Sequence, residues 1–328
     1  MTAAVHLARG AFVISIDTEL AWGLAHRRGA PVDDSHHFDR EREVIAAILA
    51  VLARFEIPAT WAIVGHLFLD HCQPDAEGRC HPELARPDYP WLDEDWFAVD
   101  PGSSLEEAPY YYGRDIVEQV AACPVEQEIA SHAFSHVIAG EEGCSAEVFA
   151  SELAASQAVA RKQGVELRSF VYPRNSIAHL ETLAAAGFTS YRGPRPVPFA
   201  GSTGWRRTAA AALDRIRPGP GSAVVPAPGP VGLWNVPQTY LFAPATSRRW
   251  APAALWARQP VARLRQAARE RSLFHLWFHP YNVTAAPERA LDVLSRVCAA
   301  AARLRDADRL DVVTMGQLAE RLSQLTPR

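Results

Sequence analysis

The chain contains 328 residues, of which 48% are hydrophobic and 21% are charged, a balance typical of globular proteins and unlike that of disordered chains. Its formal net charge of -4 provides no basic surface, which argues against a nucleic-acid or anionic membrane partner. No apolar run approaches the length of a membrane span, and the first residues lack the hydrophobic region of a secretory signal. We therefore expect a cytoplasmic protein without a membrane span.

The five cysteines are odd in number and scattered along the chain, which does not fit a disulfide framework. We expect reduced thiols. The pairs His71-Cys72 and Cys80-His81 are ligand types that suit a structural zinc ion, but the residues around them are typical of a loop. Thiols in a surface insertion are the simpler interpretation.

Two kinds of apolar pattern alternate along the chain. Residues 11–17 (AFVISID) have the character of a buried strand, and residues 40–55 carry apolar side chains at the 3.6-residue spacing of an amphipathic helix. Further strands are predicted at 59–64, 125–130, 168–172, 188–192, 233–237, 273–278 and 311–314. Further helices are predicted at 146–163, 177–186, 253–271, 287–304 and 315–325.

This succession of strands and helices favours parallel strands joined by helical crossovers. Two stretches interrupt it, at about 70–113 and 193–232, where Pro and Gly are frequent and no period is visible. We therefore predict a single α/β domain over residues 1–328, a closed or nearly closed barrel with two long loop insertions. In such barrels, ligands and catalytic groups gather at the C-terminal ends of the strands.

Two histidines follow the strand predicted at 125–130. If the segment from His132 to His136 forms a helical turn, both imidazoles project from one face. Neutral imidazole is a common ligand of zinc and similar divalent ions, and a catalytic site often has three protein ligands. The pair therefore predicts two of the three ligands of a metal site.

The end of the first strand offers two carboxylates. Asp17 and Glu19 are two residues apart in an extended segment, so their side chains point to the same side, at the mouth of the barrel. One of them can complete the metal site, and the other remains available for proton transfer.

Other polar residues occur where later strands end. Arg174 follows the strand at 168–172, and a permanent guanidinium beside a carboxylate keeps it ionised and fixes its orientation. A structural ion pair is the alternative interpretation of Arg174. His279 precedes Pro280 at the end of its strand and is the better catalytic candidate, whereas His275 lies deeper and is expected to be a hydrogen-bonded core histidine.

Four segments together resemble successive motifs of the polysaccharide deacetylases, the NodB-homology or carbohydrate esterase 4 family. They are Asp17-Thr18-Glu19, Ser131 to His136, Tyr172-Pro173-Arg174-Asn175 and His275 to His279, in the family's chain order. The resemblance extends from about residue 11 to residue 314. It implies a distorted (β/α)7-type barrel and metal-dependent removal of N-acetyl or similar acyl groups from amino sugars.

The resemblance also implies a role for each matching residue. Asp17 is similar to the family's catalytic base, His132 and His136 to its metal-binding histidines, and His279 to the histidine that protonates the leaving amine. Zinc is the expected ion, although cobalt, nickel, iron and manganese accept the same ligands.

Two motifs depart from the common pattern. Many members carry a metal-binding aspartate where Thr18 stands, but a variant subgroup spaces its carboxylates by one residue, and Glu19 is then the implied ligand. Arg174 has its proline before it rather than after it, and the resemblance implies for it the role of orienting the base.

Aromatic residues near the motifs and in the insertions suit the apolar faces of sugar rings, and they serve equally well as anchors of long loops. The candidates for substrate binding are Trp22, Trp91, Trp96, Tyr112, Trp205 and Tyr281. The expected substrate is a small N-acetylated sugar, because long insertions should restrict the mouth and no export signal is visible. Two alternatives remain: hydrolysis of another linear or cyclic amide on the same barrel, and a non-catalytic carbohydrate-binding relative.

Overall fold

The computed structural model describes residues 7–24, 35–194, 223–243 and 252–325. Its centre is strand β1 (Gly10–Thr18), which is buried along its whole length. One edge of β1 pairs in parallel with β9 (Leu273–Phe278); the other pairs in parallel first with β10 (Leu310–Val312) and then with β2 (Thr60–Ile63). A strand covered on both faces needs a continuous apolar sequence, which explains the composition of β1.

The sheet extends from this centre in both directions. Beyond β2 follow strands β3, β4, β5 and β7 in parallel order, β6 lies antiparallel to β7, and β8 pairs with β9. Their bounds are Glu128–Ser131 (β3), Ser169–Val171 (β4), Ser190–Arg192 (β5), Ala227–Pro228 (β6), Trp234–Asn235 (β7) and Tyr240–Leu241 (β8).

Side-chain contacts show that the sheet is strongly curled. Arg192 on β5 forms hydrogen bonds with Ser15 and Asp17 on β1, although three strands lie between β5 and β1 in the sheet order. In a flat sheet these strands would lie roughly 19 Å apart, beyond the reach of an arginine. The end strands β6 and β8 do not pair with each other within the described residues, so the sheet is a half-barrel. The predicted α/β barrel-like fold is confirmed, in an open form.

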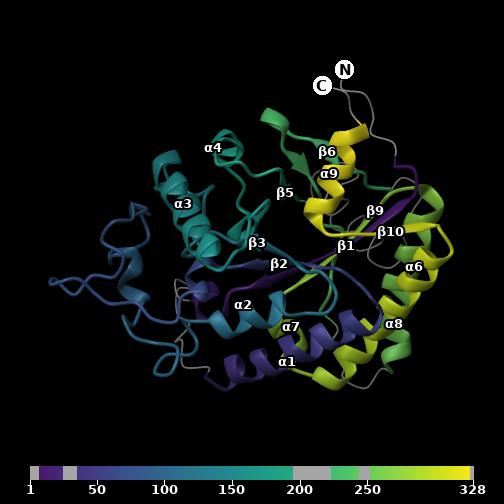
Figure 1. Ribbon diagram of the computed structural model, residues 1–328, viewed down its shortest axis with the longest axis horizontal. Helices are drawn as coiled ribbons and strands as arrows, with labels where there is room; N and C mark the ends of the chain where they lie inside the picture. The colour runs from purple at the N-terminus through teal and green to yellow at the C-terminus, as the bar shows by residue number, and fades with distance from the viewer. Residues whose placement is uncertain (1–6, 25–34, 195–222, 244–251, 326–328) are drawn as a thin grey trace, which may run out of the picture.

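Helices surround this sheet (Figure 1). Along one side α1, α8 and α6 pack beside one another. The helix bounds are Ser35–Arg54 (α1), Arg114–Ala121 (α2), Ala146–Lys162 (α3), Leu180–Ala185 (α4), Ala253–Glu270 (α6), Tyr281–Thr284 (α7), Pro287–Asp306 (α8) and Met315–Leu325 (α9). No described helix is long and apolar enough to cross a membrane.

The predicted elements agree with these bounds to within a few residues, but four short elements, α2, α7, β6 and β8, were not predicted. The segment 69–113 is irregular, as expected: it contains one 3-10 helix at Trp96–Val99 and an isolated bridge between His71 and Ser104. Most of the stretch 193–232 lies outside the described residues.

Candidate active site

A cavity of about 620 Å³ opens where the parallel strands end. Strands β1, β3, β4 and β9 all direct their C-terminal ends toward it, which is the location expected for a site in this class of fold. It is lined by Asp17, Glu19, Gly23, Trp91, His132, His136, Glu141, Arg174, Asn175, Trp277, His279 and Tyr281.

Three of the predicted metal ligands converge in this cavity. Oε2 of Glu19 lies 2.9 Å from Nε2 of His136 and 3.4 Å from Nε2 of His132. All three side chains are at least 93% buried. Gly23 makes room for the carboxylate, because a Cβ at this position would lie 2.2 Å from Cδ of Glu19.

The backbone that brings the two histidines together differs from the predicted helical turn. The segment after β3 is a loop and not a helical turn, with left-handed backbone at Ala133 (φ 62°) and His136 (φ 64°). Glu152 on α3 holds this loop, because its carboxylate accepts hydrogen bonds from the backbone N–H groups of Phe134 and Ser135 and from the Ser135 hydroxyl. The imidazole centroids still lie 5.0 Å apart.

The hydrogen bonds around these rings fit a divalent cation. Nδ1 of His132 donates to the carbonyl oxygen of Val171 at 2.7 Å, so in the neutral form of the ring the lone pair of Nε2 faces Glu19. Nε2 of His136 is buried and has no hydrogen-bond partner of correct geometry among the described residues, although Glu19 is so close. Two imidazole lone pairs and a carboxylate are the ligand types of catalytic zinc sites, so these residues fit the ion that the family resemblance implies.

Asp17 is held by an arginine that the sequence did not single out. Nη1 and Nη2 of Arg192 donate to Oδ1 and Oδ2 of Asp17 at 2.5 Å and 2.6 Å. Arg192 also donates to Ser15 and lies over the ring of Trp277, 4.6 Å from its centroid. Burial raises the pKa of Asp17, but the ion pair with Arg192 and nearby histidines outweigh burial, so the net pKa lies below its ordinary value.

Arg192 therefore takes the position that the sequence had given to Arg174. Arg174 lines the same cavity from a left-handed conformation (φ 52°), and its charge acts on His136. One sequence signal distinguishes the two arginines: Arg192 is followed by Gly193-Pro194, so its proline comes after it, whereas the proline of Arg174 comes before.

His279 lies between the two carboxylates. Its Nε2 is 3.6 Å from Oδ2 of Asp17 and 3.6 Å from Oε1 of Glu19, and its ring stacks on Tyr281 with centroids 4.4 Å apart. Burial raises the pKa of Glu19, but the effect of His279 and His136 is larger and opposite, so the net pKa lies well below its ordinary value. The carboxylates are thus ionised, and His279 is placed to exchange a proton at the cavity wall.

His275 is a core residue, as expected. It is fully buried, its Nε2 lies 2.9 Å from the hydroxyl of Ser15, and its Nδ1 lies 3.2 Å from the carbonyl oxygen of Val236. Burial lowers the pKa of His275 to about 3, with a further contribution from Arg192, so the ring is neutral.

The structure places three of the aromatic candidates for substrate binding away from the cavity. Trp22, Trp96 and Tyr112 are at most 1% exposed and do not line the cavity; they anchor irregular segments to the core. Trp205 lies outside the described residues.

Other aromatic rings do line the cavity. Tyr281 and Trp91 do so, together with Trp277, which the sequence did not suggest as a substrate contact. The indole N–H of Trp91 donates to Glu141 at 2.7 Å, and its ring stacks on Tyr89 at 5.0 Å. These contacts hold a flat aromatic surface at the mouth.

Comparisons with known proteins agree with this fold. A Mycobacterium smegmatis protein named as a polysaccharide deacetylase superposes with a TM-score of 0.62 at 16% identity, over 100% of this chain and 97% of that one. The Puue allantoinase superposes with a TM-score of 0.61 at 10% identity, over 100% and 96%. A 4-alpha-glucanotransferase from Thermococcus litoralis gives 0.55 at 12% identity, over 98% of this chain and 41% of the enzyme.

No protein-family model and no curated protein sequence matches the chain. The names of these structural neighbours refer to different reactions, so the fold they share with this chain does not by itself decide its chemistry. That decision depends on the side chains in the cavity.

Proposed function

We propose that this protein is a metal-dependent amide hydrolase that removes an N-acetyl or similar acyl group from an amino sugar or a small metabolite containing one. The observation that carries the proposal is the convergence of Glu19, His132 and His136 beside a separate carboxylate, Asp17, in one cavity. The four sequence motifs and the half-barrel fold support placing the chain near the NodB-homology deacetylases.

Asp17 and Glu19 have different surroundings, which suit different roles. Both oxygens of Asp17 are engaged by Arg192, so this carboxylate stays ionised and fixed in orientation, as a general base for the attacking water must be. Glu19 instead faces the two imidazoles and is the carboxylate that would hold the ion with them. A divalent ion bound there supplies Lewis acidity to the amide carbonyl and to the attacking water.

His279 supplies the second proton transfer. An amine is a poor leaving group until its nitrogen is protonated, and a protonated imidazole at the cavity wall can provide that proton. Its position within 3.6 Å of both carboxylates allows it to act on a bond broken between them. Stacking on Tyr281 keeps the ring in this orientation.

The lining of the cavity supports a sugar as substrate. Trp91, Trp277 and Tyr281 present aromatic rings, and Glu141, Arg174 and Asn175 add polar groups around them. Sugars bind proteins in this way, with apolar faces against aromatic rings and hydroxyl groups against polar side chains. A volume of about 620 Å³ accommodates a small molecule of this kind.

The similarity to an allantoinase favours a second candidate, hydrolysis of another linear or cyclic amide. A substrate panel separates the two: N-acetylated amino sugars, formamides and cyclic amides are supplied to zinc-loaded protein, and acetate, formate or ring opening is measured. Turnover of the amino sugars supports the first candidate, and turnover of the cyclic amides alone supports the second.

The same panel with His132→Ala tests the metal site. We expect this variant to lose the active-site ion and activity together. A His132→Ala protein that retains the wild-type metal content and full turnover would refute the assignment.

A further inference from the structure

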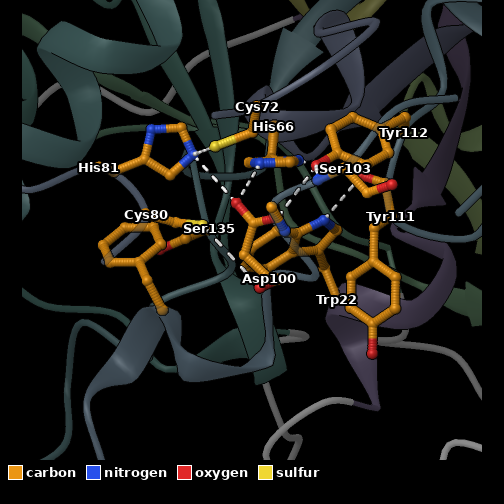
Figure 2. A network of polar contacts seen from close by, with 12 residues as sticks. Trp22, His66, Cys72, Cys80, His81, Asp100, Ser103, Tyr111, Tyr112 and Ser135 are labelled. Carbon is orange, nitrogen blue, oxygen red and sulfur yellow. Dashed lines mark hydrogen bonds and ion pairs between the residues drawn. The ribbon is translucent and has the colours of Figure 1, made fainter. Parts of the chain in front are cut away.

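A second group of ligand-type side chains lies outside the candidate active site. One ligand atom from each of four residues, His66, Cys72, His81 and Asp100, lies within 4.8 Å of the others. Figure 2 shows these four side chains directed toward a common point. The sequence had suggested His71-Cys72 and Cys80-His81, and the fold keeps one residue of each pair and adds His66 and Asp100.

Distances in this second ligand cluster are at or somewhat below those of a tetrahedral metal site. Oδ2 of Asp100 lies 2.9 Å from Nε2 of His66 and 3.2 Å from Nε2 of His81, and Sγ of Cys72 lies 3.4 Å from Nε2 of His81. Ligand atoms around a tetrahedral zinc are about 3.3 to 3.6 Å apart, given bonds of about 2.0 to 2.3 Å. The four atoms are therefore close to the spacing that an ion needs.

The surrounding hydrogen bonds orient the ligands inward. Nδ1 of His66 lies 3.0 Å from the carbonyl oxygen of Tyr111 and donates to it, so in the neutral form of the ring the lone pair of Nε2 points at Asp100. The hydroxyl of Tyr112 and the N–H of Gly102 both donate to Oδ1 of Asp100, which leaves Oδ2 for the cluster. In that form Nε2 of His66 and Oδ2 of Asp100 both offer lone pairs at a separation of 2.9 Å, an arrangement that suits a cation bound by both.

Burial strengthens this argument. The side chains of His66 and Asp100 are fully buried, and that of His81 is 11% exposed. Buried charged and polar groups need partners, because they have lost their water. A metal ion satisfies all four ligand atoms at once.

The cluster joins an irregular segment to the barrel. His66 belongs to the short 3-10 helix Gly65–Phe68 that follows β2, whereas the other three ligands belong to the irregular segment 69–113. Such a segment has few backbone hydrogen bonds of its own, and a metal can replace the missing secondary structure as a cross-link.

The cluster also lies behind the loop that carries the active-site histidines. The N–H of His66 donates to the carbonyl oxygen of Phe134, between His132 and His136. The ring of Trp22, three residues after Glu19, packs on His66 with centroids 4.5 Å apart. A metal at the cluster would therefore also brace the residues that form the candidate active site.

We propose that His66, Cys72, His81 and Asp100 bind a structural zinc ion. One thiolate and two imidazoles favour zinc over magnesium, calcium or manganese, and four protein ligands leave no open position, which is the pattern of a structural and not a catalytic site. The proposal does not depend on the reaction proposed above.

The test is metal stoichiometry of the full chain, loaded with zinc and then desalted. His132→Ala/His136→Ala removes the active-site ligands, and we expect this protein to retain one zinc per chain. Adding Cys72→Ser or His81→Ala to this double variant should reduce its zinc content to none. The matched controls Cys123→Ser and His71→Ala, at a half-buried free thiol and an exposed histidine, should retain it.

Cobalt loading gives an independent readout. The active-site cluster contains no cysteine, so a thiolate-to-cobalt charge-transfer band would report an ion bound elsewhere, and its loss on replacing Cys72 would assign it to the second ligand cluster. We expect this band in His132→Ala/His136→Ala and its loss on adding Cys72→Ser. If the cysteine variant fails to fold, the proposal is tested by adding a chelator to His132→Ala/His136→Ala, because removal of the structural ion should lower the Tm of that protein. A double variant that binds no zinc, or a cobalt spectrum without a thiolate band, would overturn the proposal.

Discussion

Arg192 and Asp17 form a buried, two-pronged ion pair across the half-barrel, with both guanidinium nitrogens 2.5 to 2.6 Å from the two carboxylate oxygens. Residues from β5 and β1 meet in this way only because the sheet is curled. The pair determines both the orientation and the ionisation of the proposed base.

Replacing this arginine should shift the acid side of the pH–rate profile. Arg192 opposes the effect of burial on Asp17; in Arg192→Gln burial prevails and the pKa of Asp17 rises. Because the base must be ionised, the acid limb of kcat/KM should move to higher pH, and kcat at pH 7 should fall by roughly 10²-fold or more. Arg174→Gln is the matched control and should leave the acid limb in place. If the acid limb of kcat/KM in Arg192→Gln stayed at its wild-type pH, Arg192 would not be the residue that keeps Asp17 ionised.

The role of His279 predicts a dependence on the leaving group. In His279→Asn, kcat for an N-acetylated amino sugar should fall by about 10²- to 10⁴-fold, because the amine leaves without a proton donor. An activated anilide, whose amine leaves more readily, should lose much less. Tyr281→Phe preserves the ring that stacks on His279 and serves as the control. Equal losses for both substrates would argue against His279 as the acid.

The aromatic residues should divide into two classes. Trp91 is half-buried at the mouth of the cavity, so Trp91→Ala should raise KM by roughly 2- to 10-fold with little change in Tm. Trp96 is 1% exposed and donates to Ser135 at 2.7 Å, so Trp96→Ala should lower the free energy of unfolding by about 3 to 5 kcal/mol. Kinetics and thermal unfolding should be measured on both variants. A Trp91→Ala protein that loses stability without any rise in KM would contradict the division.

His275 should make stability depend on pH. Its pKa in the folded protein is lowered from 6.5 to about 3 by burial, so below pH 6.5 the unfolded chain binds a proton that the folded chain does not. Stability is therefore lost as the pH falls from about 6.5 toward 3, by about 1.4 kcal/mol per unit. His275→Asn should be less stable than wild type at pH 7, by roughly 1 to 3 kcal/mol for its lost hydrogen bonds.

The difference in free energy of unfolding between wild type and His275→Asn should become smaller as the pH is lowered to 4, because the variant has no histidine at position 275 to protonate. Urea unfolding at several pH values measures this. His71→Asn, at an exposed position, should follow wild type throughout. A constant difference would show that His275 is not buried in its neutral form.

The sequence predicted the parts of the site that follow from local periodicity. Asp17, Glu19 and His279 lie at or just after the C-terminal ends of long apolar strands that are easy to recognise, and the fold brings them together as expected. The conformation of the His132 loop could not be predicted, because it is determined by the left-handed backbone at Ala133 and by the buried Glu152 on another segment, α3.

Arg192 and the full set of the second ligand cluster, of which the sequence had suggested only Cys72 and His81 among its zinc-type pairs, could not be predicted for a different reason. Strand β5 has only three residues, and its contact with β1 depends on the curl of the whole sheet. Cys72, His81 and Asp100 lie in a segment without a period, so nothing in the sequence shows that they meet His66. Long-range closure and irregular loops leave little local pattern to read.

The central claim is that Glu19 holds a catalytic ion while Asp17 acts on the substrate. It is tested most directly by zinc content and rate of acetate release, measured on the same preparations of wild type, Asp17→Asn and Glu19→Ala. We expect Asp17→Asn to keep the wild-type zinc content with a rate about 10³-fold lower, and Glu19→Ala to lose one zinc together with the activity. An Asp17→Asn protein as fast as wild type, or a Glu19→Ala protein with unchanged zinc and rate, would contradict the account.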